Sequence, residues 1–129
     1  MNDAERLAKE LFAAFGRRDL AAAAALIGED AVWRFPGESG ALAGDHRGRE
    51  AIFGFLMKAA SLAEGSFHAE AVEIVGNDRV AFHHFVGHAA RGGKTLRNDT
   101  CLRLEFSDGK LIAAQEWVWD LQHVEEFWS

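Results

Sequence analysis

From residue 66 onward, apolar and polar residues alternate with a period of two, and this alternation constrains the fold more than any other feature of the chain. Turn-forming clusters interrupt the alternation at residues 76–78, 92–93 and 107–109, and each contains glycine. Such clusters between alternating segments are typical of β-hairpins. The pattern therefore predicts four consecutive antiparallel strands, at about residues 67–75, 79–90, 94–106 and 110–120.

The first half of the chain is predicted to be mainly helical. Asn2 or Asp3 can cap a first helix, which Gly16 ends, and Asp19 can cap a second helix that runs to Ile27 with Gly28 as its C-cap. A short strand is expected at 31–35, a glycine-rich loop at 36–48, and a third helix after it. The third helix carries on one side Ile52, Phe53, Leu56, Met57 and Ala60.

Helices followed by a strand meander predict an α+β fold, in which a long antiparallel sheet twists and curls over helices on one face. We expect one domain over residues 1–129, with a short final helix or extension from about residue 121 to 128.

Charge and composition exclude several classes of function. The net charge of −6 argues against nucleic-acid binding. Cys101 is the only cysteine, so no intramolecular disulfide can form and the chain suits a reducing compartment. We find no apolar run of about 18 residues and no signal-peptide pattern, so we expect a cytoplasmic protein without membrane contact. The absence of tyrosine excludes any mechanism that needs a tyrosine hydroxyl.

Strand parity predicts which side chains face the helices. In the third long strand the inner set is predicted to be Leu96, Asn98, Thr100, Leu102, Leu104 and Phe106. In the second, the bulkier set is chosen as the core face: Val80, Phe82, His84, Val86 and His88. In the last strand one face carries Ile112, Ala114, Glu116, Val118 and Asp120. The other face carries Trp117 and Trp119, so both faces look partly buried, and we expect a homodimer through the outer face of the sheet.

Several segments resemble a known family. Asp19 to Trp33 (DLAAAAALIGEDAVW), the Phe35-Pro36-Gly37 triplet and Gly44 to Ile52 (GDHRGREAI) are similar to the first half of a SnoaL-like domain. Gly93 to Asp99 (GKTLRND), Phe106 to Ile112 (FSDGKLI) and Gln115-Glu116-Trp117 are similar to its closing strands. This family belongs to the nuclear-transport-factor-2-like superfamily, with the ketosteroid isomerases and polyketide cyclases. The resemblance implies a cone-shaped, strongly curved, mainly antiparallel sheet wrapped around three N-terminal helices (a cystatin-like α-β barrel roll), with a pocket at its open end.

The resemblance also implies site residues. Glu116 stands where phenazine-biosynthesis proteins and limonene-epoxide hydrolases keep an inward acid, and Asn98 resembles the inward asparagine of the phenazine-type proteins. Phe35 and Leu102 occupy the places of the ketosteroid isomerase base and oxyanion-stabilising acid, which argues against steroid isomerisation. The Arg-x-Asp pair of the epoxide hydrolases would fall on Phe82 and His84, so that triad is incomplete.

Three residues are the catalytic candidates: Glu116, His84 and Asp120. A buried Glu116 would have a raised pKa and could act as a general acid or base, whereas the alternative is an ion pair with an arginine or a place at the pocket rim. His84 could assist proton transfer, or it could be a core histidine bonded to a neighbour. Asp120 lies about 13 Å along the strand from Glu116 and fits better as the cap of the final helix.

The residues expected to line the pocket are Trp33, Phe35, Phe53, Leu56, Phe82, Asn98, Leu102 and Val118. We expect neither a cofactor nor a metal, because His83 is predicted to face away from His84 and His88. The sequence thus favours a small cofactor-independent enzyme (isomerase, cyclase, dehydratase or epoxide hydrolase) that acts on an apolar small molecule. The alternative is a non-catalytic ligand-binding or dimerisation module. An unpaired Glu116 in an open apolar pocket would favour the enzyme. The module would be favoured by a Glu116 bonded to an arginine, or by a pocket collapsed by Trp33, Phe35 and Phe82.

Overall fold

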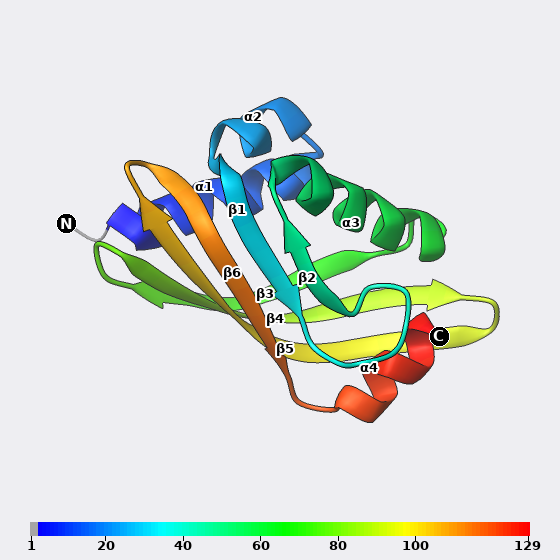
Figure 1. The fold of residues 1–129 in the computed structure, drawn as a ribbon. Coiled ribbons are helices and arrows are strands. Elements are labelled where there is room, and N and C mark those ends of the chain that lie inside the picture. Colours follow the sequence, from blue (N-terminus) through cyan, green and yellow to red (C-terminus); the bar gives the residue numbers. More distant parts are fainter. Residues whose placement is uncertain (1–2) are drawn as a thin grey trace.

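The computed structural model describes residues 3–129, which form one curved six-stranded sheet with helices on its inner face (Figure 1). The elements in chain order are α1 (Asp3–Arg17), α2 (Leu20–Ala25), β1 (Ile27–Phe35), β2 (Gly44–Arg47), α3 (Arg49–Leu62), β3 (His68–Gly76), β4 (Val80–Arg91), β5 (Lys94–Ser107), β6 (Lys110–Val118) and α4 (Leu121–Trp128). The sheet does not close into a barrel: its strand order is β2-β1-β6-β5-β4-β3, which leaves β2 and β3 as edges. The α+β prediction is confirmed.

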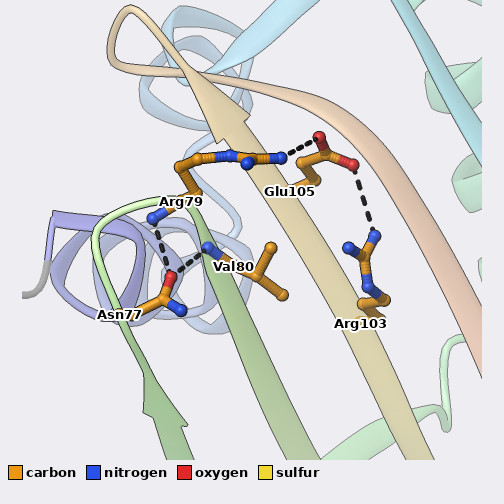
Figure 2. A network of polar contacts seen from close by, with 5 residues as sticks. All are labelled: Asn77, Arg79, Val80, Arg103 and Glu105. Carbon is orange, nitrogen blue, oxygen red and sulfur yellow. Dashed lines mark hydrogen bonds and ion pairs between the residues drawn. The ribbon is translucent and has the colours of Figure 1, made fainter.

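The predicted four-strand meander is present as β3 to β6. Its strands pair antiparallel, and β1 adds to β6 in the one parallel pairing among the described strands. The turns fall where the glycine clusters predicted them, and Gly93 and Gly109 adopt φ angles of 81° and 77°, which favour glycine. Figure 2 shows the β3–β4 turn, where Asn77 Oδ1 accepts hydrogen bonds from the backbone N–H groups of Arg79 and Val80, each 2.9 Å long.

The first half differs from the prediction at three places, and the smallest is that α1 continues through Gly16 to Arg17. Helix α2 ends at Ala25, so Gly28 lies inside β1 and does not cap the helix. The reason is pairing: Ile27 is fully buried and pairs with Leu111 of β6, which draws the chain into the sheet early. The expected loop also contains a strand, because residues 44–47 pair with β1 as β2. Asn2, one of the two residues expected to cap α1, lies outside the described residues.

The face assignment is confirmed for β5 and wrong for β4. The predicted inner residues of β5, from Leu96 to Phe106, are all buried. In β4 the smaller set faces the helices instead: Ala81, His83, Phe85, Gly87 and Ala89. Phe82 is 40% exposed and His84 half-buried, both on the outer face. These smaller side chains can form the core face because Phe12 of α1 packs against His83 and Phe85 and fills the space over the strand.

A register shift in the β5–β6 pairing changes the face of β6 partway along. Phe106 pairs with Leu111, but Glu105 pairs with Ala113, so Ile112 is the extra residue of a bulge. Leu111 is therefore fully buried and Ile112 exposed, the reverse of the prediction. Beyond the bulge the predicted parity holds, and Glu116 and Val118 lie on the inner side.

The last helix and the segment after β1 meet at one end of the inner face. Asp120 caps α4 by accepting a hydrogen bond of 3.1 Å from the His123 N–H, as predicted. Glu125 Oε2 accepts hydrogen bonds from the backbone N–H groups of Glu38 and Ser39 and from the Ser39 hydroxyl. We call these three contacts the Glu125 latch. No helix within residues 3–129 has the length and apolar character needed to cross a membrane.

Candidate functional site

Glu116 is the central polar group of the inner face. It lies on β6 opposite Leu102 of β5, and the residue is 8% exposed. Trp33 Nε1 donates a hydrogen bond of 3.1 Å to Glu116 Oε2. Burial raises the pKa of Glu116 to about 7, although the bond from Trp33 favours the ionised form and opposes the rise. No arginine or lysine among residues 3–129 pairs with it, so Glu116 is not part of a structural ion pair.

Further aromatic rings pack beside Trp33, the hydrogen-bond partner of Glu116. The ring of Phe55, from α3, lies 6.1 Å from that of Trp33 and 5.7 Å from that of Phe35, measured between centroids. His46 of β2 stacks on Phe55 at 4.2 Å. The carboxyl of Glu116 thus lies beside an aromatic cluster, and its burial removes the water that would solvate a charge.

Two further polar residues of the inner face have no protein partner. Asn98 on β5 is 6% exposed and His83 on β4 is 1% exposed. The Asn98 Oδ1 atom and both ring nitrogens of His83 are buried without a hydrogen bond. Burial lowers the pKa of His83 to about 4, with a smaller contribution from the neighbouring His84. Unpartnered buried polar groups are rare in folded proteins, so both residues call for an explanation.

His83 was assigned to the wrong face in the sequence, although the hairpin itself could have placed it. The Gly92-Gly93 turn sets the register in which Arg91 pairs with Lys94, and counting back along both strands brings His83 opposite Leu102. Directly paired residues share a face of the sheet. Because Leu102 is securely assigned to the inner face, its partner His83 must lie on the inner face as well.

The remaining catalytic candidates lie away from Glu116. His84 is on the outer face, where its Nε2 atom lies 2.6 Å from Asp99 Oδ1, so its predicted inward position is wrong. Asp120 is exposed and caps α4. With Trp117, Trp119 and other residues, the His84–Asp99 pair lines an open groove of about 400 Å³ on the outer face.

Seven of the eight predicted lining residues lie on the inner side. Trp33, Asn98 and Leu102 are buried there, and the half-buried residues that pack against the core are Phe35, Phe53, Leu56 and Val118. Phe82 is the exception, because its strand presents the opposite face. Residues 3–129 contain no group of three or more histidine, cysteine or acidic side chains arranged to hold a metal ion.

The sequence model of the SnoaL-like domain matches residues 8–114. The chain therefore belongs to the SnoaL-like domain family. It is 28% identical over 124 residues to the uncharacterized protein Rv0034 of Mycobacterium tuberculosis, a match that covers 95% of this chain and 94% of that protein.

Solved structures agree with this membership. Bal32a, from a soil-derived mobile gene cassette, is 34% identical, with a TM-score of 0.92 over 99% of this chain and 100% of its own. TerC, solved in co-crystals with polyporic acid, is 19% identical, with a TM-score of 0.82 over 98% of both chains. At this identity the similarity shows that the two proteins share a fold, and no more. Other structures of this fold are described as NTF2-like and cystatin-like, as expected from the sequence. The fold is one that ligand-binding proteins and polyketide cyclase-type enzymes share.

Proposed function

We propose that this protein binds an apolar small molecule at the inner face of the sheet and transfers a proton to or from it through Glu116, without a cofactor. One observation carries the proposal: the Glu116 carboxyl is buried, and its hydrogen-bond partner is the Trp33 indole rather than an arginine. A structural ion pair would hold the pKa of Glu116 low, whereas the pKa here is raised to about 7.

The raised pKa suits acid–base chemistry. Near neutral pH the protonated and ionised forms of Glu116 coexist, so the group can give up a proton or take one with little free-energy cost. Trp33 holds Oε2 by a hydrogen bond, and in the proposed reaction Oε1, which no residue of 3–129 hydrogen-bonds, exchanges the proton. Isomerisation, cyclisation, dehydration and epoxide opening all need such a step.

The walls around Glu116 indicate the kind of ligand. Trp33, Phe35 and Phe55 offer aromatic surface, and Leu102 lies beside the carboxyl on the neighbouring strand. Asn98 adds one free acceptor, its Oδ1 atom, which would accept a hydrogen bond from a ligand hydroxyl. An apolar ring system with a hydroxyl or carbonyl group fits these contacts. TerC, of the same fold, was co-crystallised with an organic acid, which supports a small molecule as the ligand class.

A general test does not require the natural substrate. Cyclohexanone, 1-indanone and 2-tetralone exchange the hydrogens next to their carbonyl with D₂O when a base removes them, and NMR follows the exchange. We expect the wild type to accelerate exchange of at least one ketone, with a rate that rises as the pH increases through about 7. Glu116→Gln should lower the rate by at least about 100-fold, since a positioned base contributes factors of this order.

The matched control is Glu105→Gln, because Glu105 lies on the outer face of β5 and pairs with Arg79 and Arg103 (Figure 2). It should exchange the ketones like the wild type. Equal rates in Glu116→Gln and the wild type would rule out Glu116 as the base. A wild type that accelerates none of the three ketones would contradict the proposed chemistry.

The outer face supports a second proposal, assembly into a homodimer. Trp117 and Trp119 are 48% and 88% exposed and flank the outer groove. Large exposed aromatic side chains that gather at a groove often mark an interface. Sedimentation velocity at micromolar concentration should show a dimer that the double variant Trp117→Ser, Trp119→Ser converts to a monomer. A monomeric wild type would refute the dimer without bearing on Glu116.

A further inference from the structure

The Glu116 carboxyl is closed off from solvent in this structure. Glu116 is buried, and so are Leu102 opposite it and its hydrogen-bond partner Trp33. A molecule that reacts at Glu116 can therefore reach it only after a covering segment has moved. The segment that moves at the lowest cost is one that few contacts hold in place.

Residues 36–43 have the features of such a segment. They connect β1 to β2 without regular secondary structure, and Leu42 is the one buried residue among them. Figure 1 shows this connection as the loop that leaves the end of β1, passes α4 and returns to β2. Gly37 and Gly44, at its two ends, adopt φ angles of 101° and 110°. Both ends of the segment thus have the backbone freedom of glycine, which suits a hinge.

The Glu125 latch holds this segment against α4. The Oε2 atom of Glu125 accepts hydrogen bonds of 3.2 Å from each of the backbone N–H groups of Glu38 and Ser39, and one of 3.1 Å from the Ser39 hydroxyl. One backbone hydrogen bond of 3.4 Å, from the Ala41 N–H to the Trp128 carbonyl, joins the segment to the same helix. A rotation of the Glu125 side chain would therefore break three contacts at once without disturbing the core.

Leu42 connects the segment to the Trp33–Glu116 pair. The Leu42 carbonyl accepts a hydrogen bond of 2.9 Å from His46 Nε2, and the His46 ring stacks on Phe55. Phe55 packs in turn beside Trp33, whose indole donates to Glu116. When Leu42 leaves the core, His46 and Phe55 lose a neighbour that keeps them in place, and the indole becomes accessible.

We propose that residues 36–43 are a lid, held shut by the Glu125 latch, and that release of the latch admits the ligand to Glu116. This inference rests on the proposed function. The hydrogen bonds from Ser39, and to a smaller extent the one from Glu38, lower the pKa of Glu125. The carboxylate is therefore charged at neutral pH, where it keeps the lid closed most of the time. Opening is a local motion of one loop and leaves the sheet folded.

Hydrogen exchange of the Trp33 indole N–H measures this opening without any substrate. NMR follows the indole signals after the protein is transferred into D₂O. Glu125→Gln replaces a charged acceptor with a neutral one and should accelerate exchange of the Trp33 indole by about 10-fold. Gly37→Ala should accelerate it as well, because a Cβ atom at this position would lie 2.7 Å from Glu125 Oε2 and displace the carboxylate. The backbone amide of Leu104 in the core of β5 should keep its wild-type rate in both variants.

The matched control is Glu126→Gln, the same replacement on the next residue of α4, whose exposed side chain is not part of the latch. Its Trp33 indole should exchange like that of the wild type. The inference is overturned if either latch variant leaves the indole exchange unchanged. It is also overturned if the indole accelerates only together with the Leu104 amide, because the whole protein is then less stable and no lid has opened.

The ketones of the general test decide whether the lid is the entrance for the ligand. A ligand that binds only the open form has a higher apparent affinity when that form is more populated. We therefore expect Glu125→Gln to deuterate a ketone faster than the wild type at ketone concentrations far below saturation. An equal or lower rate overturns the inference and leaves the assignment of Glu116 intact. A wild type that deuterates none of the ketones contradicts the proposed function, and the indole exchange then decides alone whether the latch holds a lid.

Discussion

Glu116 and His83, the two buried titratable groups of the inner face, should cancel each other's effect on how stability changes with pH. The pKa of Glu116 is raised from 4.5 to about 7, so between these values the folded state holds a proton that the unfolded state has released. The pKa of His83 is lowered from 6.5 to about 4, so over that range the unfolded state binds a proton that the folded state excludes. Between pH 4.5 and 6.5 the two differences in bound protons cancel.

Single substitutions should expose each contribution with opposite sign. Glu116→Gln lacks the Glu116 contribution, so its stability relative to the wild type should fall as the pH is lowered from 7 towards 4.5. His83→Phe lacks the His83 contribution, so its stability relative to the wild type should fall as the pH is raised from 4 towards 6.5. Each slope is about 1.4 kcal/mol per pH unit, and each total change is about 3 kcal/mol.

Urea unfolding followed by tryptophan fluorescence, at half-unit steps from pH 4.5 to 7, measures these slopes. The free energy of unfolding of each variant is compared with that of the wild type at the same pH. This comparison removes the background from Glu70 and Glu125, whose pKa values are lowered by their hydrogen bonds in all the proteins. Between pH 4.5 and 6.5 the double variant should return to a flat difference. Slopes of the same sign in the two single variants, or no slope in either, would refute the reasoning.

Three further predictions concern other parts of the molecule. Asp120→Ala removes the cap of α4 and should lower the free energy of unfolding by about 1 kcal/mol in urea, whereas Asp120→Asn should retain most of it. Glu125→Gln weakens the Glu125 latch, so amide hydrogen exchange at Glu38 and Ser39 should accelerate while α1 and β5 stay protected. Because burial raises the pKa of Cys101, iodoacetamide at pH 8 should alkylate it more slowly than free cysteine, as mass spectrometry would show.

Local signals in the sequence were enough for most of the fold. The hairpins at Gly92-Gly93 and Ser107-Asp108-Gly109, the cap at Asp120 and the inner face of β5 depend on neighbours along the chain or on one clear alternation. Strand β2 could not be predicted in this way, because four residues show no periodicity and the strand exists only through its pairing with β1. The bulge at Ile112 is similarly a matter of pairing, not of pattern.

In the candidate site, too, residues with a clear local pattern were predicted and a residue that depends on distant contacts was not. Glu116 and Asn98 were found, because clean alternation and a family resemblance agreed on them. His83 was missed, because the bulk of side chains was used to choose the face of β4, and the space over that strand is filled by Phe12 from a distant helix. Several elements together fill the volume of a core. The size of the side chains in one strand therefore predicts which face is buried less well than the register of its hairpin does.

The parallel pairing of β1 with β6 has a consequence for the nascent chain. The Trp33–Glu116 hydrogen bond joins residues 83 positions apart, so β1 leaves the ribosome long before its pairing partner is made. Until then β1 has β2 on one side and an open edge on the other, and such edges invite aggregation. Contacts this distant in sequence also form late in folding. A translation stall before about residue 110 should therefore leave an aggregation-prone fragment that depends on chaperones.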